Sequence, residues 1–403
     1  MPTDSTSRPT STLPLHSPDF YAGDPYPAYR ELRTSTPIVW NDATNFWALT
    51  KYEDIRYVSG HPLTFTSTKG ITIPDPSQPE PVQEGNLIFT DPPRHRQLRK
   101  LINSGFTRRQ VTLLEPKVRE IVKGILDEVD PSREYEFAEE IAAPLPTRLI
   151  AEMLGAPPED WEQFRTWSDA AVGTADPDIE LDNVVALGQL YEYFTKLIDA
   201  RRSGEVVGDD LLSILAAAEV DGERLTDADL LNFSFLLLVA GNETTRNLIA
   251  LGTQALLAHP DQFALLRAKP ELLPLAVEEM LRFTSPVTHM AREATEDVEI
   301  RGQRIRAGEK IVMLYGAANR DTDIFGPTSE EFDITRNPNP HIAFGAGEHA
   351  CLGAQLARLE ARIMFEVLLG TYPTIELTGD VTRLRATMVP GVKKMPVRLK
   401  ASV

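Results

Sequence analysis

The chain has 403 residues, of which 42% are hydrophobic and one is a cysteine, and its net charge is −18 at pH 7. The hydrophobic content is enough for a large core, whereas the charge argues against nucleic acid and anionic membrane surfaces as partners. The single cysteine excludes an internal disulfide and suits a reducing cytoplasm, and the chain has no run of about 18 apolar residues that could span a membrane.

The first residues are expected to lie outside the folded part. Residues 1–18 are polar and lack the basic-then-apolar order of a signal peptide, so we predict a disordered N-terminal tail. No low-complexity linker divides residues 19–403, which we expect to form a single domain.

The pattern of residues 24–60 predicts a short helix, two strands around Ile38–Trp40 and Phe46–Leu49, and a second helix. Residues 62–93 are rich in proline, glycine, serine and threonine, which predicts a long loop. A loop of this length inside a compact domain is usually functional, often as a lid.

A basic helix is predicted directly after this loop. His95 and Arg99 are four residues apart, so they share one helix face and could clamp an anion together. A solvated basic helix is the alternative. No acidic residue lies between Pro92 and Leu114, whereas six basic ones do: Arg94, Arg96, Arg99, Lys100, Arg108 and Arg109.

Helical periodicity continues to about Phe283, and the longest helix is predicted from Asp227 to Ala258. Its interior contains a glycine and two adjacent threonines, which intrinsic helix propensity disfavours. The Thr244 hydroxyl can bond the carbonyl of Ala240 and bend the helix locally. An imperfect core helix without a special role is the alternative.

The helix that ends near Phe283 carries Glu279 and Arg282 three positions apart, so the two charges share one face. On the residues alone, this could equally be an exposed ion pair of little energetic value. Residues 287–315 predict short strands, and after an irregular stretch a helix is predicted from Cys351 to Gly370, followed by short strands. The predicted fold is therefore mainly α with a small β region.

The only cysteine, Cys351, follows a glycine-rich turn and precedes this last long helix. Backbone N–H groups and the helix dipole at such a position stabilise a thiolate, the form that binds metal. One thiolate cannot build a zinc or iron–sulfur site, but it can be the single protein ligand of a haem iron. A buried structural cysteine is the alternative.

The string Phe-Gly-x-Gly-x-His-x-Cys-x-Gly, from Phe344 to Gly353, resembles the haem-binding loop of the cytochrome P-450 superfamily, and the resemblance to its soluble bacterial class covers essentially the whole chain. It implies a single-domain fold with haem b (iron protoporphyrin IX) between the long central helix and the cysteine-loop helix. Cys351 would ligate the iron, and Phe344 would shield its sulfur. Glycines at Gly345, Gly347 and Gly353 would allow the loop to approach the porphyrin.

The resemblance implies further roles. His95, Arg99, Arg292 and His349 would hold the haem propionates, with His341 as an additional candidate. Ala240, Glu243 and Thr244 would lie over the haem, where the acid and the hydroxyl deliver protons and stabilise oxygen intermediates. A buried triad of Glu279, Arg282 and Arg336 would be structural, holding the segment that presents the cysteine loop.

The family's topology also implies an apolar substrate pocket built from four distant segments. Its predicted residues are Ile71, Ile73, Leu87, Ile88, Phe235, Leu238, Val239, Val287, Thr288, Met290, Met388 and Val389.

The resemblance implies a monomeric, cytoplasmic monooxygenase that hydroxylates a small to medium apolar molecule, such as a steroid, terpenoid or fatty acid. It would use dioxygen and two electrons from a ferredoxin and its ferredoxin reductase. Three alternatives remain: a non-hydroxylating relative that performs coupling, dehydration or rearrangement, a non-catalytic haem sensor or carrier, and a haem-free helical binding protein.

Overall fold

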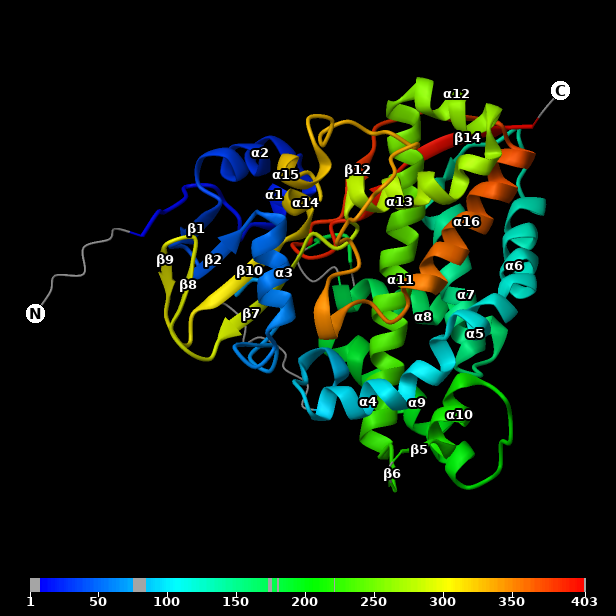
Figure 1. Cartoon of the computed structure of the whole chain (residues 1–403). Helices are drawn as coiled ribbons and strands as arrows, with labels where there is room; N and C mark the ends of the chain where they lie inside the picture. The colour runs from blue at the N-terminus through cyan, green and yellow to red at the C-terminus, as the bar shows by residue number, and fades with distance from the viewer. Residues whose placement is uncertain (1–7, 75–84, 173–175, 180, 221, 402–403) are drawn as a thin grey trace, which may run out of the picture.

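The computed structural model describes residues 8–74, 85–172, 176–179, 181–220 and 222–401. Helices gather on one side of the molecule and a small β region on the other, with the central helix running through the helical side (Figure 1). The mainly α fold with a small β region is therefore confirmed.

The helices lie throughout the chain: α1 (Pro18–Ala22), α2 (Tyr26–Ser35), α3 (Tyr52–Gly60), α4 (Arg94–Ile102), α5 (Arg108–Leu113), α6 (Glu115–Asp127), α7 (Pro144–Met153), α8 (Trp161–Val172), α9 (Asn183–Arg202), α10 (Leu211–Ala217), α11 (Asp227–Ala258), α12 (Pro260–Ala268), α13 (Leu273–Thr284), α14 (Tyr315–Ala318), α15 (Thr322–Phe325) and α16 (Ala354–Thr371). The strands are β1 (Ile38–Asn41), β2 (Phe46–Leu49), β3 (Phe65–Thr66), β4 (Tyr135–Glu136), β5 (Glu219–Val220), β6 (Glu223–Arg224), β7 (His289–Ala294), β8 (Val298–Ile300), β9 (Gln303–Ile305), β10 (Lys310–Leu314), β11 (Thr374–Leu377), β12 (Thr382–Arg383), β13 (Val392–Lys394) and β14 (Pro396–Lys400).

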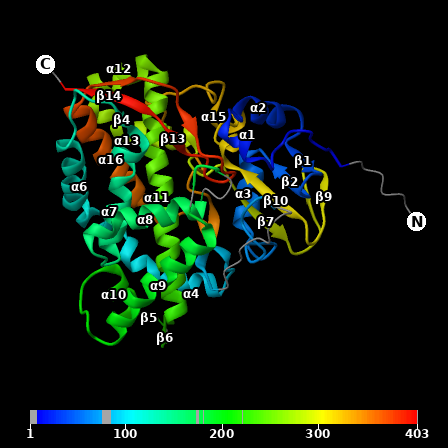
Figure 2. The same ribbon diagram turned by 180° about the vertical axis from the view of Figure 1, so that it is seen from behind.

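The central helix α11 has the predicted bounds. Thr226 caps its first turn, because its side chain accepts the N–H of Asp229 while the Asp229 side chain accepts the N–H of Thr226. The helix packs against α7, α8, α9, α13 and α16, so it is buried on most sides. Helices α11 and α16 lie side by side in both views (Figures 1 and 2), as expected for the helices that flank the predicted haem site.

The main sheet has the strand order β1-β2-β10-β7-β3. Strand β2 runs parallel to β10, and the other neighbours are antiparallel. Both faces of β2 are covered, since Phe46 and Trp47 point to opposite faces and are both fully buried. This sheet fixes β7, which carries Arg292 toward the helical side.

The N-terminal segment differs from its prediction. Residues 8–17 pack on the sheet: the N–H of Trp40 donates to Pro9 (2.7 Å), the N–H of Ser11 donates to the carbonyl of Trp40 (3.0 Å), and Leu15 is fully buried. The predicted disordered tail is therefore wrong for residues 8–17, because they cover the open edge of β1, which composition does not reveal. Residues 1–7 lie outside the described residues.

The predicted long loop contains two short elements, β3 and a 3₁₀ turn at Leu87–Phe89. Residues 75–84 of this loop lie outside the described residues. Within the described ranges, no helix is both long enough and apolar enough to cross a membrane.

Candidate active site

Cys351 lies in the loop between a 3₁₀ turn at Gly347–His349 and helix α16. Its N–H donates to the carbonyl of Phe344 (2.8 Å), which closes the loop. The side chain is exposed, although it lies deep in the molecule, because its surface is that of a cavity. Burial raises the pKa of the thiol, and the Gly353 N–H and Arg99 only partly oppose this. A bound metal cation would favour the thiolate form further.

Two glycines of the loop have positive φ angles, +70° at Gly345 and +68° at Gly347. A Cβ on Gly347 would lie 2.1 Å from the carbonyl oxygen of Ser59, so this glycine lets the loop touch α3. Gly347 does not line the cavity that contains Cys351. A Cβ on Gly353 would lie 4.0 Å from the Cys351 sulfur, an ordinary van der Waals contact, so Gly353 lies directly beside the sulfur.

A large cavity separates the cysteine loop from α11. Cys351, Phe344 and the start of α16 form one wall, and one face of α11 forms the opposite wall. The α11 wall consists of Phe233, Leu236, Leu237, Ala240, Gly241, Thr244, Thr245 and Leu248. The cavity thus lies where the sequence places the haem, between the central helix and the cysteine-loop helix.

Four of the residues predicted for the substrate pocket line this cavity: Leu87, Ile88, Val287 and Met290. The other eight do not line it: Ile71, Ile73, Phe235, Leu238, Val239, Thr288, Met388 and Val389.

The errors on α11 concern the helix face. Phe235 stacks on Tyr191 of α9, with ring centroids 5.8 Å apart, and Leu238 is fully buried in the helical core. The cavity-lining residues instead precede Thr244 by steps of three and four, the spacing of one helix face. In the other segments, Ile73 packs in the core near the N-terminal helices, and the Thr288 hydroxyl donates to the carbonyl of Thr387 (2.7 Å).

Four predicted propionate ligands line the same cavity: His95, Arg99, Arg292 and His349. Both ring nitrogens of the buried His95 lack a hydrogen-bond partner among the described residues. Arg292 is bonded only to the adjacent carbonyl of Ala291 (2.6 Å), and Arg99 makes no hydrogen bond within the described part of the chain. Burial, the largest cause, lowers the pKa of both arginines. Buried or half-buried donors of this kind are stabilised by an anionic partner, so they fit the propionates of haem.

The additional propionate candidate, His341, is not brought into this group. Its Nε2 lies 3.0 Å from Glu278, and its Nδ1 accepts the N–H of Ala343. Glu278 is also held by Arg358, and these partners lower the pKa of its carboxyl to about 2 despite burial. His341 therefore stabilises the cysteine-loop segment instead of lining the cavity.

The acid and the alcohol of α11 point in different directions. The Thr244 hydroxyl faces the cavity and donates to the carbonyl of Ala240 (2.6 Å), the bond predicted from the sequence. Glu243 is buried outside the cavity wall, 2.5 Å from Arg246, which also contacts Asp169 and Glu139. Burial, followed by the nearby carboxylates, raises the pKa of Glu243 to about 8, although Arg246 opposes the shift.

The structure assembles the predicted triad. Arg282 donates two hydrogen bonds of 2.7 Å to Glu279, and Arg336 lies 3.2 Å from the same carboxylate. Glu279 also accepts the N–H of Asp333 and the amide of Asn339, so it fixes the irregular stretch before the cysteine loop. The i,i+3 spacing identified the first pair, whereas Arg336 was expected only from the family resemblance.

Sequence reasoning missed several residues of the cavity. Tyr315 and Glu360 lie in its wall, as do Phe106 and Ile150 from neighbouring helices. Glu360 is buried, its Oε2 has no partner among the described residues, and burial raises its pKa to about 8. Glu360 lies nine residues after Cys351, on the inner side of an amphipathic helix. This position in the sequence could have identified Glu360 as a cavity residue.

A single thiol, unpaired buried cations and an apolar opposite wall define a haem protein with one thiolate ligand. Comparison with known proteins agrees with this class. A family model described as cytochrome P450 matches residues 186–389. The chain is 38% identical to a methyl-branched lipid omega-hydroxylase of Mycobacterium tuberculosis, over 96% of this chain and 95% of that protein. It is 40% identical to a steroid C26-monooxygenase of the same species, over 94% of this chain and 95% of that protein.

Among solved structures, a Mycobacterium marinum cytochrome P450 in complex with pseudoionone is similar, with a TM-score of 0.88 and 37% identity. The match covers 98% of this chain and 100% of that chain. The chain belongs to the cytochrome P450 family. It is accordingly a haem b-dependent monooxygenase, an oxidoreductase that hydroxylates apolar substrates with dioxygen.

Proposed function

We propose that Cys351 is the axial ligand of the haem iron and that His95, Arg99, Arg292 and His349 hold the propionates. The observation that carries this proposal is one cavity bounded by the only thiol, these four donors and the apolar face of α11. When bound there, haem activates dioxygen, and the thiolate increases electron density at the iron.

The residues of α11 serve proton delivery. Thr244 offers a hydroxyl at the cavity wall, where it can donate to or accept from a reacting oxygen in place of its bond to Ala240. Glu243, whose pKa is raised by burial and lowered by Arg246, lies on the far side of the helix. Its partners Asp169 and Glu139 are partly exposed, so the cluster connects Glu243 to solvent. Glu243 must leave Arg246 to pass a proton toward Thr244.

The substrate is a small to medium apolar molecule, such as a steroid, terpenoid or fatty acid. The supporting side chains are Leu87, Ile88, Phe106, Phe233, Leu236, Leu237, Val287 and Met290. They orient the substrate by shape and exclude water, since they have no polar group. The named substrates of the relatives, a methyl-branched lipid and a steroid, have the same apolar chemistry.

The electron donor is an acidic ferredoxin, reduced by its reductase. The part of the chain between Pro92 and Leu114, the basic segment, supports this assignment. Its residues Arg96, Arg99, Lys100 and Asn103 line a surface depression together with Gly347 and Glu348 of the cysteine loop. A donor bound there would lie next to the loop that carries Cys351. We further propose that the enzyme acts as a cytoplasmic monomer.

A turnover experiment tests this function. Steroids, terpenoids and fatty acids that shift the haem absorption spectrum are incubated with ¹⁸O₂, NAD(P)H, ferredoxin and reductase. We expect a product carrying one ¹⁸O atom, formed only when the complete electron-transfer system is present. Binding of these compounds without any partner-dependent product would contradict the proposal and favour a haem carrier.

A further inference from the structure

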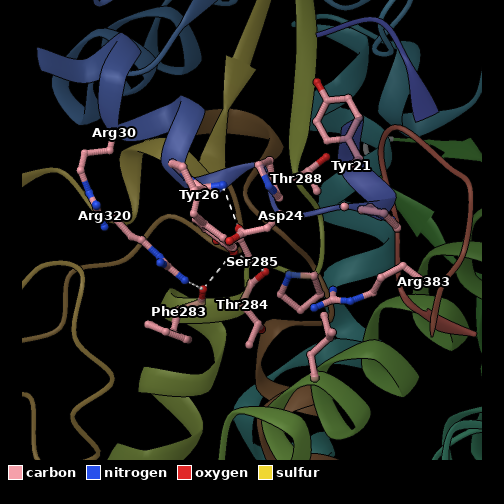
Figure 3. Close-up of a pocket in the computed structure, with 16 residues that line it drawn as sticks. Tyr21, Asp24, Tyr26, Arg30, Phe283, Thr284, Ser285, Thr288, Arg320 and Arg383 are labelled. Atoms are coloured by element: carbon pink, nitrogen blue, oxygen red, sulfur yellow. Dashed lines mark hydrogen bonds between the residues drawn. The ribbon is translucent and has the colours of Figure 1, made fainter. Parts of the chain in front are cut away.

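A second cavity lies beside the N-terminal helices, apart from the one that contains Cys351. It lies between the segment joining α1 to α2, the end of α13 and strand β12 (Figure 3). Pro286 lines both cavities, so only a thin wall separates them. The mouth is near Asp24 and Arg30, which are exposed.

Arg383 is the unusual residue of this cavity. Its guanidinium points toward the middle of the lining residues, in the direction of Thr284 (Figure 3). Within the described ranges its hydrogen-bond partner is the neutral amide of Gln254 in α11, at 3.1 Å, and no carboxylate pairs with it. Burial lowers the pKa of Arg383, and the nearby Tyr26 and Asp24 only partly oppose this.

The other charges of the lining are compensated. Arg30 and Arg320 each lie 3.3 Å from Glu330. Asp24 accepts the N–H of Tyr26 at 3.1 Å, and its negative charge acts on Arg383 without a direct ion pair between them. Arg383 is half-buried and makes no direct ion pair among the described residues, so it is the place in this cavity where an anion would be stabilised.

The surface around Arg383 is apolar. Leu251, Pro286 and Pro390 line the cavity next to it, and Phe283 and Tyr26 close the opposite side, with Arg320 stacked between their rings. A free inorganic anion would gain nothing from these side chains. A molecule that combines an anionic group with an apolar body would use both features.

We propose that this cavity binds a small organic carboxylate, with its carboxylate on Arg383 and its apolar body against Leu251, Pro286 and Pro390. The planar guanidinium can donate two parallel hydrogen bonds to a carboxylate. This site is distinct from the haem cavity and does not depend on the proposed substrate.

The first test uses 4-fluorobenzoate and the purified holoenzyme, with the haem cavity filled by clotrimazole. Binding is followed by ¹⁹F NMR for wild type, Arg383→Gln and the matched control Arg385→Gln, whose exposed side chain pairs with Asp19 outside the cavity. We expect saturable binding to wild type and control, and binding weakened about tenfold or more in Arg383→Gln. Absence of saturable binding to wild type, or equal binding by the two variants, would overturn the proposal.

A second measurement does not depend on the folding of a variant. Crystals of the wild-type holoenzyme are soaked with 4-bromobenzoate, and the bromine is located by its anomalous signal. We expect one peak in this cavity, with the carboxylate bonded to Arg383. A peak elsewhere, or none, would contradict the site.

Discussion

The Thr244 hydroxyl of α11 lies at the cavity wall, and replacing it with alanine tests its role. Thr244→Ala should bind haem and substrate normally, but product formed per NAD(P)H should fall about tenfold, because a reacting oxygen loses a hydrogen-bond partner. The missing reducing equivalents should appear as hydrogen peroxide, which is measured together with product.

The control for this variant is Thr253→Ala. Thr253 lies on the same helix, and its hydroxyl makes the same kind of bond, to the carbonyl of Ile249 at 2.9 Å, but it does not line the cavity. Equal coupling in the two variants would show that Thr244 has no role in delivering protons.

Glu360 gives a pH dependence whose sign is fixed by its environment. Burial raises its pKa from 4.5 to about 8, so between these values the folded protein holds a proton that the unfolded chain releases. Its contribution therefore lowers the free energy of unfolding as pH rises, by at most about 1.4 kcal/mol per pH unit. Chemical unfolding of wild type and Glu360→Gln at pH 6 and pH 8 measures this contribution.

The glutamine variant keeps the size of the side chain but cannot ionise. Its advantage in stability over wild type should grow from pH 6 to pH 8, since only wild type has to bury a charge or retain a proton. A constant difference between the two proteins would mean that Glu360 does not titrate in this range.

At the scale of single residues, the sequence motif predicted which residue types form the site better than it predicted where each side chain points. Cys351, His95, Arg99 and Arg292 meet at one cavity as expected. His341 does not, because its ring is held by Glu278, a partner 63 positions away that no local pattern reveals.

At the scale of elements, the face that α11 presents to the cavity can be tested with two adjacent leucines. Leu237 lines the cavity and Leu238 is fully buried in the core. Leu237→Phe should occupy cavity space and change substrate affinity or the position of oxidation while the fold stays stable. Leu238→Phe should instead destabilise the protein by about 1–3 kcal/mol, because it overpacks the core.

The measurements are substrate titration of the haem spectrum and chemical unfolding for both variants. If Leu238→Phe altered substrate selectivity more than Leu237→Phe, the assignment of the helix face would be wrong.

The bounds of α11 could be predicted because the capping residues and the apolar pattern are local. Its cavity-facing side was predicted wrongly for Phe235 and Leu238, although steps of three and four back from Thr244 lead to Ala240, Leu237 and Phe233. Apolar residues surround this helix on all sides, so hydrophobicity alone could not select a face.

At the scale of the whole molecule, the basic segment is expected to guide the electron donor. Arg108 and Arg109 begin α5 and are exposed, in a chain whose net charge is −18. Reversing both to glutamate should slow reduction by ferredoxin several-fold and weaken its dependence on ionic strength, because long-range attraction to an acidic partner is lost. Stopped-flow reduction at several salt concentrations measures both effects.

The matched control reverses Arg267 and Lys269, which are exposed at the end of α12, at the top of Figure 1. This control changes the net charge equally but should leave the rate of reduction near that of wild type. Equal effects of both double variants would assign the steering to overall charge and not to a docking face.

The segment at residues 8–17 shows why long-range structure escapes sequence reading at this scale. Its polar composition predicts disorder, yet its backbone pairs with Trp40 on the edge of the sheet and Leu15 is fully buried. Likewise, the Asp333 N–H and the Asn339 amide that Glu279 accepts become visible only once the chain has folded.

The central claim, that the haem iron is held by the Cys351 thiolate, is tested most directly by the absorption spectrum of the reduced carbonyl complex. The wild-type protein should show the far-red Soret band that thiolate ligation produces. Cys351→Ser, in which His95, Arg99, Arg292 and His349 can still hold the haem, should lack this band. A wild-type protein without the band, or a variant that keeps it, would contradict the account.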